Sequence, residues 1–159
     1  MGFMKCILYS AAIGFLSFLI GRVLPAAWFS ADRFPYKTWK WENGGNIYNQ
    51  LFHIRRWQAK VPDMSKLFKS FMPQKKMTAD FDLQLPVMIR ETCIAELIHV
   101  ILCFLSLPCM IFSPGTGGVL FTFFYILGNL PFIFIQRYNR PRFLRLQHKI
   151  TSTSKRKDS

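Results

Sequence analysis

The chain has 159 residues, enough for one small domain, and combines 51% hydrophobic residues with a formal charge of +13. Such a composition is typical of a nucleic-acid binder or of a membrane protein with basic cytoplasmic parts. The charges avoid three long apolar runs, and no zinc-finger, RRM or KH pattern is present, which argues against a nucleic-acid partner. We therefore predict an all-α integral membrane protein with a single membrane-embedded domain over residues 1–148.

The first apolar run covers residues 7–24 and is long enough to cross a bilayer, since a spanning helix needs about 20 residues. Lys5 precedes the run, and Arg22 lies at its far end, where its side chain can reach the interface. A cleaved signal peptide is the alternative, because small residues follow in PAAWFSA. Arg22 and Pro25 favour an uncleaved anchor.

Residues 32–91 form a basic, aromatic segment that we predict to be cytoplasmic and to contain amphipathic helices. The stretch IYNQLFHIRRWQAK predicts a helix with Ile47, Leu51 and Ile54 on one side. Asp63 can cap a second helix with apolar residues at i, i+3, i+4, i+7 and i+8. These are Met64, Leu67, Phe68, Phe71 and Met72. Either both helices pack together in a small soluble lobe, or the second lies on an anionic leaflet.

The second apolar run covers residues 93–112 and is interrupted by Pro108, and the third covers residues 119–135. The turn SPGTGG joins them and carries no charge. Pro141 is expected to stop any helix that continues from the third run. Residues 149–159 are polar and basic, and we expect them to form a disordered tail.

The distribution of charge predicts how the three spans cross the membrane. The loop after the first run and the tail after the third are strongly basic, whereas the turn between the second and third is uncharged. Because basic loops remain in the cytoplasm, we predict a multi-pass protein of the cell membrane with its N-terminus outside. The polar groups of the second and third runs then gather at the cytoplasmic face, which we expect to be the active face.

Glu96 and His99 lie just inside the second run, where ionisable groups are costly and are therefore candidates for function. With Thr92 they share one helical face, at i, i+4 and i+7. A carboxylate beside an imidazole can orient the ring and raise its basicity. We therefore predict His99 as a catalytic general base and Glu96 as the catalytic residue that orients it. A buried polar pair that holds helices together is the alternative.

A second polar group lies in and after the third run. Asn129, Gln136 and Arg140 share a helical face at i, i+7 and i+11. Arginine side chains bind phosphates and carboxylates, although they can also anchor a helix to lipid head groups. The candidate substrate-binding residues are Asn129, Gln136, Arg137, Tyr138, Asn139, Arg140 and Arg142.

We predict no metal site and no bound cofactor. Only three histidines are present, and His53 and His148 are remote from His99 in sequence. The chain has no Walker, GxGxxG or GxSxG motif. The four cysteines have no CxxC spacing, and we interpret them as small apolar core residues.

Two motifs, ETCIAELIH at residues 91–99 and NLPFIFIQRYNRPR at residues 129–142, together with the spacing of the two spans, resemble the glycosyl-4,4'-diaponeurosporenoate acyltransferase family. The resemblance covers about residues 40–148. It implies a membrane O-acyltransferase that esterifies a fatty acid onto the glucose 6-hydroxyl of a glycosylated carotenoid. This is the last step in making staphyloxanthin-type pigments.

The resemblance also implies partners. These are membrane lipids, a glycosylated carotenoid or another glycolipid as acceptor, other pathway enzymes, and an acyl donor that is either an acyl-CoA or an acyl carrier protein. The arginines of the candidate set would hold the phosphates or the carrier of the donor, and Asn129, Gln136 or Tyr138 would hold the sugar or the developing oxyanion. The competing function is a non-catalytic membrane scaffold or lipid-binding protein that organises other enzymes.

Overall fold

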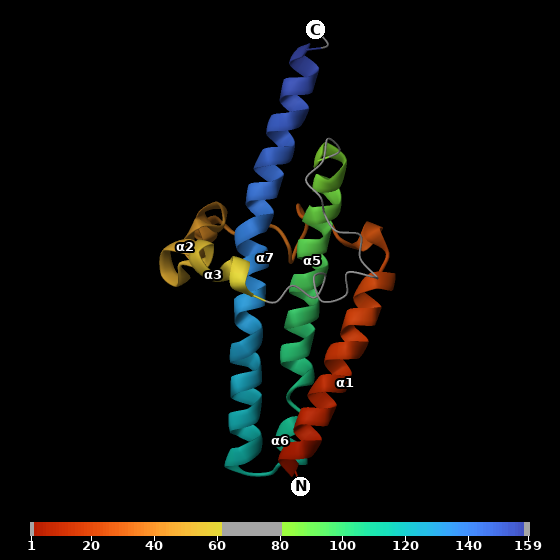
Figure 1. Ribbon diagram of the computed structural model, residues 1–159, viewed down its shortest axis with the longest axis vertical. Helices are drawn as coiled ribbons and strands as arrows, with labels where there is room; N and C mark the ends of the chain where they lie inside the picture. The colour runs from red at the N-terminus through yellow and green to blue at the C-terminus, as the bar shows by residue number, and fades with distance from the viewer. Residues whose placement is uncertain (1, 62–80, 158–159) are drawn as a thin grey trace.

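The computed structural model describes residues 2–61 and 81–157, and every regular element in this part of the chain is a helix. Three helical segments are long and apolar enough to cross a membrane: Gly2–Val23, Gln84–Phe112 and Thr116–Thr153. They stand side by side as a bundle (Figure 1). The predicted all-α class with three candidate spans is therefore confirmed.

The central pair of the bundle is formed by α5 (Phe81–Leu105) and α7 (Thr116–Lys157). α5 ends before Pro108, and the short α6 (Cys109–Phe112) follows, as the interruption of the second run predicts. α7 continues through Pro141, so the predicted stop at this proline is wrong. Residues 149–157 also continue the helix, where the sequence predicts a disordered tail.

The lobe packs against α7 where the helix continues through Pro141. A proline removes the hydrogen bond to the carbonyl four residues earlier, which here belongs to Arg137. The 3-10 helix η2 (Lys40–Gly45) lies against this carbonyl, so closely that a Cβ atom on Gly45 would stand 2.9 Å from it. Gly45 has a φ of 85°, so both the backbone conformation and the lack of space require glycine.

Helix α1 (Gly2–Val23) packs against the central pair with one narrow face. Its buried residues are Cys6, Ser10, Ile13 and Ser17. Gly21 allows the closest approach, because a Cβ atom there would lie 2.4 Å from Cδ1 of Ile98 on α5. The other faces of α1 are apolar and exposed, as expected for a helix surrounded by lipid.

The segment after α1 forms a lobe beside α7 (Figure 1). Its elements are η1 (Ala26–Trp28), η2, α2 (Asn46–Phe52), α3 (Ile54–Trp57) and η3 (Gln58–Lys60). The single helix predicted here is broken at His53, which has a φ of 51°. The break separates the expected common face: Ile54 is fully buried, whereas Leu51 is 64% exposed. The second predicted amphipathic helix, at residues 63–72, lies outside the described residues.

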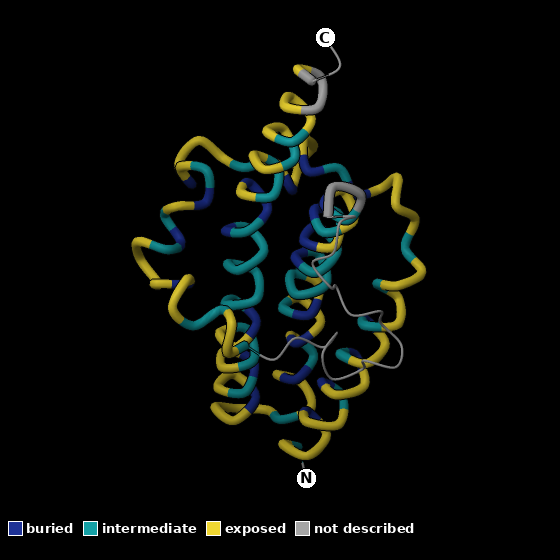
Figure 2. Tube along the Cα trace, turned by 45° about the horizontal axis from the view of Figure 1, so that its top comes forward, coloured by how far each residue is buried: buried dark blue, intermediate teal, exposed yellow. Residues whose placement is uncertain are grey.

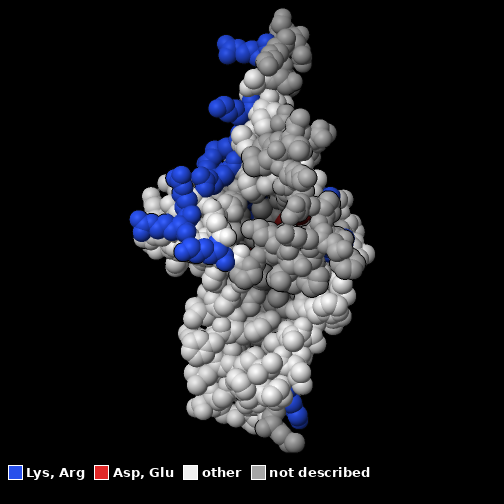
Figure 3. Space-filling view, viewed as in Figure 1, with Lys and Arg blue, Asp and Glu red and all other residues white. Residues whose placement is uncertain are grey.

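The two ends of the bundle differ in chemistry. The lobe lies beside the middle of α7, whose C-terminal part extends beyond it, and the N-terminus and the turn between α6 and α7 lie at the opposite end (Figure 1). Lysine and arginine side chains gather on the lobe and along the end of α7 (Figure 3). The exposed basic residues of this surface are Arg55, Arg56, Lys60, Arg142, Arg145 and Lys149. The basic residues of the lobe and those of the C-terminal part of α7 therefore lie on the same side of the molecule (Figure 3).

Exposed residues cover the outer faces of the three helices, and buried residues concentrate inside the bundle and where the lobe joins it (Figure 2). Less than a quarter of the most apolar window of each candidate span is buried, with fractions of 17%, 22% and 17%. The remaining apolar surface is available to lipid. The polar side chains on the inner faces of α5 and α7 are therefore the candidates for a functional site.

Candidate functional site

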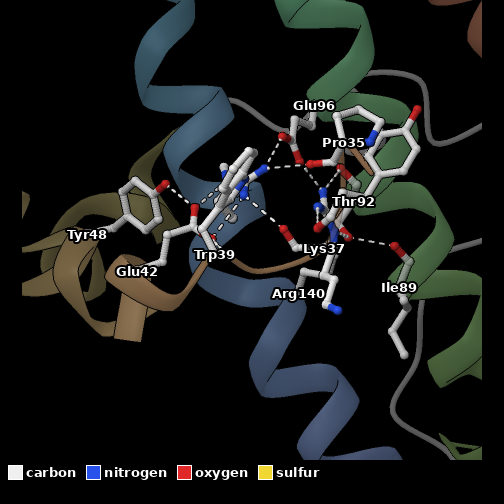
Figure 4. A network of polar contacts seen from close by, with 11 residues as sticks. Pro35, Lys37, Trp39, Glu42, Tyr48, Ile89, Thr92, Glu96 and Arg140 are labelled. Atoms are coloured by element: carbon white, nitrogen blue, oxygen red, sulfur yellow. Dashed lines mark hydrogen bonds and ion pairs between the residues drawn. The ribbon is translucent and has the colours of Figure 1, made fainter. Parts of the chain in front are cut away.

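Two arginines and two glutamates form a buried network where α5, α7 and η2 meet (Figure 4). Arg137 on α7 donates from Nε and Nη2 to Glu42, the latter at 3.0 Å, and from Nη1 to Oε1 of Glu96 at 2.6 Å. Arg140 donates from Nη2 to Oε2 of Glu96 at 2.5 Å. Two carboxylates therefore balance the charge of two guanidinium groups.

Arg140 is enclosed by protein acceptors and is 1% exposed. Its Nε donates to Oγ1 of Thr92 and its Nη2 to the carbonyl of Thr92, both at 2.9 Å, while Nη1 donates to the carbonyl of Tyr36 at 2.8 Å. Arg137 likewise has only protein acceptors among the described residues. The geometry thus favours a structural role for both arginines, although the sequence suggested that they bind substrate.

Glu42 is a central member of the network that the sequence analysis missed. It is fully buried and accepts hydrogen bonds from the Tyr48 hydroxyl at 2.5 Å and from the Trp39 backbone N–H at 2.6 Å. Burial alone raises the pKa of Glu42, but the hydrogen bonds from Arg137, Tyr48 and Trp39 outweigh it and hold the pKa below its ordinary value of 4.5. The only sequence signal was an acidic residue directly after two tryptophans, Trp39 and Trp41, in a basic segment.

This lowered pKa predicts how acid affects stability. Because the pKa of Glu42 is lower in the folded than in the unfolded protein, its contribution is fully present above pH 4.5 and is lost as the pH falls through the folded-state value. We expect the unfolding temperature of the detergent-solubilised protein to fall below pH 4.5. Glu42→Gln should be less stable than wild type at pH 7 and lose less on acidification; equal acid sensitivity would contradict the assignment.

His99 pairs with Asn129 across the interface of α5 and α7. Nδ1 of His99 lies 2.8 Å from Oδ1 of Asn129, and the imidazole stacks on Phe132 with ring centroids 4.6 Å apart. Nδ2 of Asn129 donates to the carbonyl of Tyr125 at 2.8 Å, which directs the amide oxygen to the histidine. Nδ1 of His99 therefore carries the proton, and Nε2 is the basic nitrogen.

Asn129, rather than Glu96, is therefore the residue that orients the imidazole. Both carboxylate oxygens of Glu96 accept hydrogen bonds from arginines. The predicted shared face is nevertheless present, because Thr92, Glu96 and His99 all contact α7. Nε2 of His99 forms no hydrogen bond within the described residues, and the residue is half-buried. This nitrogen is thus the free basic atom on this face.

The other predicted binding residues divide into two groups. Tyr138 is 3% exposed and packs with Tyr48 and Ile54, so it belongs to the core. Gln136 and Asn139 are half-buried and make no side-chain hydrogen bond within the described residues. Arg142 is exposed, and its guanidinium lies 4.6 Å from the centre of the Tyr138 ring. Among residues 2–61 and 81–157, no cluster of three metal-binding side chains is found.

Comparison with known proteins identifies the family to which the chain is related. Residues 25–149 match the glycosyl-4,4'-diaponeurosporenoate acyltransferase family. The chain belongs to this family. The glycosyl-4,4'-diaponeurosporenoate acyltransferases of Staphylococcus aureus strains MRSA252 and N315 are 34% and 33% identical to it over 142 residues, which cover 87% of this chain and 84% of each relative. No solved structure matches the chain.

Membership in the glycosyl-4,4'-diaponeurosporenoate acyltransferase family confirms the predicted resemblance and identifies the chain as an acyltransferase. The matched range begins after α1 and contains both the Glu42–Arg137–Glu96–Arg140 network and the His99–Asn129 pair. The name of these relatives indicates an acyltransferase that acts on glycosyl-4,4'-diaponeurosporenoate.

Proposed function

We propose that the protein transfers a fatty acyl group from a thioester to the glucose 6-hydroxyl of a glycosylated carotenoid or a similar glycolipid. The observation that carries this proposal is the pairing of His99 with Asn129, which leaves Nε2 of a neutral imidazole as a base beside the apolar interior. Family membership supports the acyl-transfer chemistry and the name of the relatives supports the acceptor.

His99 acts as the general base in this mechanism. Its Nε2 accepts the proton of the sugar hydroxyl as the hydroxyl oxygen forms a bond to the thioester carbonyl carbon. Asn129 keeps Nδ1 protonated and stabilises the imidazolium that results. The carbon–sulfur bond of the tetrahedral intermediate then breaks, and the departing thiolate takes the proton from His99. The products are a sugar ester and a free thiol.

Three polar side chains on α7 are suited to bind the substrates, and one of them, Arg142, also donates a hydrogen bond to the Tyr138 hydroxyl. Gln136 and Asn139 are three positions apart on the helix and offer amide donors and acceptors for the sugar hydroxyls. Arg142 belongs to the exposed basic surface, which suits the phosphates of an acyl-CoA or the acidic surface of an acyl carrier protein. We therefore propose that the donor approaches from the basic end of the bundle.

The orientation in the membrane can be tested with introduced cysteines. If the basic end is cytoplasmic, Thr116→Cys in the uncharged turn should react with a membrane-impermeant maleimide in intact cells. Thr151→Cys, near the end of α7, should react only after the cells are permeabilised. Both threonines are exposed, whereas the native cysteines are buried or half-buried and give a low background. The reverse pattern would place the basic end outside.

The proposed activity is tested by supplying isolated membranes with a glycosylated carotenoid and a radiolabelled fatty acyl-CoA. Membranes containing the protein should form a labelled ester that alkaline hydrolysis releases, and membranes without it should not. The assay is repeated with acyl carrier protein as the donor and with other glycolipids as acceptors. If no combination yields ester, the catalytic proposal is rejected in favour of a scaffold.

A further inference from the structure

An apolar groove lies on the membrane-facing part of the bundle, between the start of α7 and the start of α1. It has a volume of about 550 Å³ and is lined by Phe3, Gly117, Leu120, Phe121, Phe124 and Tyr125. Phe3 is the contribution of α1, and its ring meets that of Phe121 edge-on with centroids 5.5 Å apart. The groove is therefore formed by two helices and contains almost no polar surface.

The groove leads along α7 toward His99. Gly117, Phe121, Tyr125, Gly128 and Phe132 follow one another at intervals of four, four, three and four residues, and so they lie along one side of the helix. Tyr125 lines the groove, and its carbonyl accepts the hydrogen bond from Asn129. Phe132, at the other end of this side, carries the stacked imidazole of His99. Tyr125 thus joins the groove to Asn129, the partner of His99, along this side of α7.

Two glycines keep this side of α7 open. A Cβ atom on Gly128 would meet no atom within 4 Å, and one on Gly117 would meet only Oγ of Ser113, at 3.2 Å. Gly118 is different, because a Cβ atom there would stand 2.2 Å from the Ser113 carbonyl, so this glycine is required for helix packing. Packing between helices therefore requires neither Gly117 nor Gly128, and both leave room along this side of α7.

We propose that the groove holds the hydrocarbon chain of the acyl donor, with its thioester at His99 and its methyl end beside Gly117. This inference rests on the proposed acyl transfer. The eleven helical steps from Gly117 to Gly128 span about 17 Å. That length is close to half of the roughly 30 Å hydrocarbon core, which one acyl chain fills, and is too short for a chain that crosses the whole core.

The groove therefore sets the length of the acyl chain that is transferred. Gly117→Leu fills its far end, and we expect the ratio of hexadecanoyl to decanoyl transfer from an equal mixture of the two CoA thioesters to fall about tenfold, since each buried methylene contributes to binding. Leu8→Phe is the matched control, because it adds bulk to an exposed side chain of α1 outside the groove. An unchanged ratio in Gly117→Leu would overturn the proposal.

A photochemical experiment separates this inference from the proposed function. Hexadecanoyl-CoA with a diazirine at its terminal carbon is added to membranes containing the wild-type protein and irradiated. We expect labelling within residues 116–125, and this result supports the groove even if no ester is formed. Labelling elsewhere overturns the groove even if ester is formed. In membranes containing His99→Ala, where transfer is slowed, loss of the label on adding glycosylated carotenoid also overturns it, because the acceptor's chain would then be the occupant.

Discussion

Replacing His99 with alanine is expected to lower acyl transfer by about 10²- to 10⁴-fold, the usual contribution of a positioned general base. The variant should still accumulate and fold, because His99 contributes one hydrogen bond and one ring contact to the interface of α5 and α7. The measurement is the initial rate of ester formation in membranes, normalised to the amount of protein. His148→Ala is the control, since this exposed histidine lies outside the site.

Asn129→Leu provides a second test of the same assignment. Without the amide oxygen, nothing holds the proton on Nδ1, so a fraction of the histidines will carry it on Nε2 and cannot accept the sugar proton. We expect a smaller loss than for His99→Ala, and no additional loss in the double variant. Near-normal turnover of His99→Ala would instead assign the base to another residue.

Replacing Arg140 with methionine is expected to have the largest effect on stability. The substitution leaves Glu96 buried with one of its two arginines and removes the donors to Thr92 and Tyr36. Removing one partner of a buried ion pair costs about 3–5 kcal/mol. Thermal unfolding of the detergent-solubilised protein should therefore shift strongly downward. Arg142→Met, which removes an exposed guanidinium from the same helix, should change the unfolding free energy by less than about 1 kcal/mol.

Coupling between Arg140 and Glu96 distinguishes an ion pair from general loss of packing. If the pair is the source of the effect, Glu96→Gln combined with Arg140→Met should destabilise the protein by less than the sum of the single variants. The reason is that the double variant no longer contains a buried carboxylate facing a missing guanidinium. Strictly additive effects would show that the two residues stabilise the fold independently.

The sequence predicted the spans and the polar face because both follow from local periodicity. Apolar runs of sufficient length identify spanning helices, and the spacing of Thr92, Glu96 and His99 places them on one side of α5. Periodicity does not identify a partner across the bundle. The choice of Asn129 for His99 and of Glu42 for Arg137 depends on contacts between residues 30 and 95 positions apart. These partners required the three-dimensional structure.

Local rules also failed where tertiary contacts compensate for their cost. Proline should end a helix, yet Pro141 lies within α7, where η2 packs closely against the carbonyl that the proline leaves free. In the opposite direction, apolar spacing suggested one helix through His53, but this residue has a positive φ that interrupts the helix, and Leu51 is exposed. Both differences lie at or near the place where the lobe meets α7.

The order of synthesis separates the two halves of the Glu42–Arg137–Glu96–Arg140 network. Both glutamates precede both arginines in the chain, so they leave the ribosome first. Only α7 supplies the guanidinium groups that neutralise them. A chain that ended before α7 would therefore hold Glu42 and Glu96 without an arginine partner.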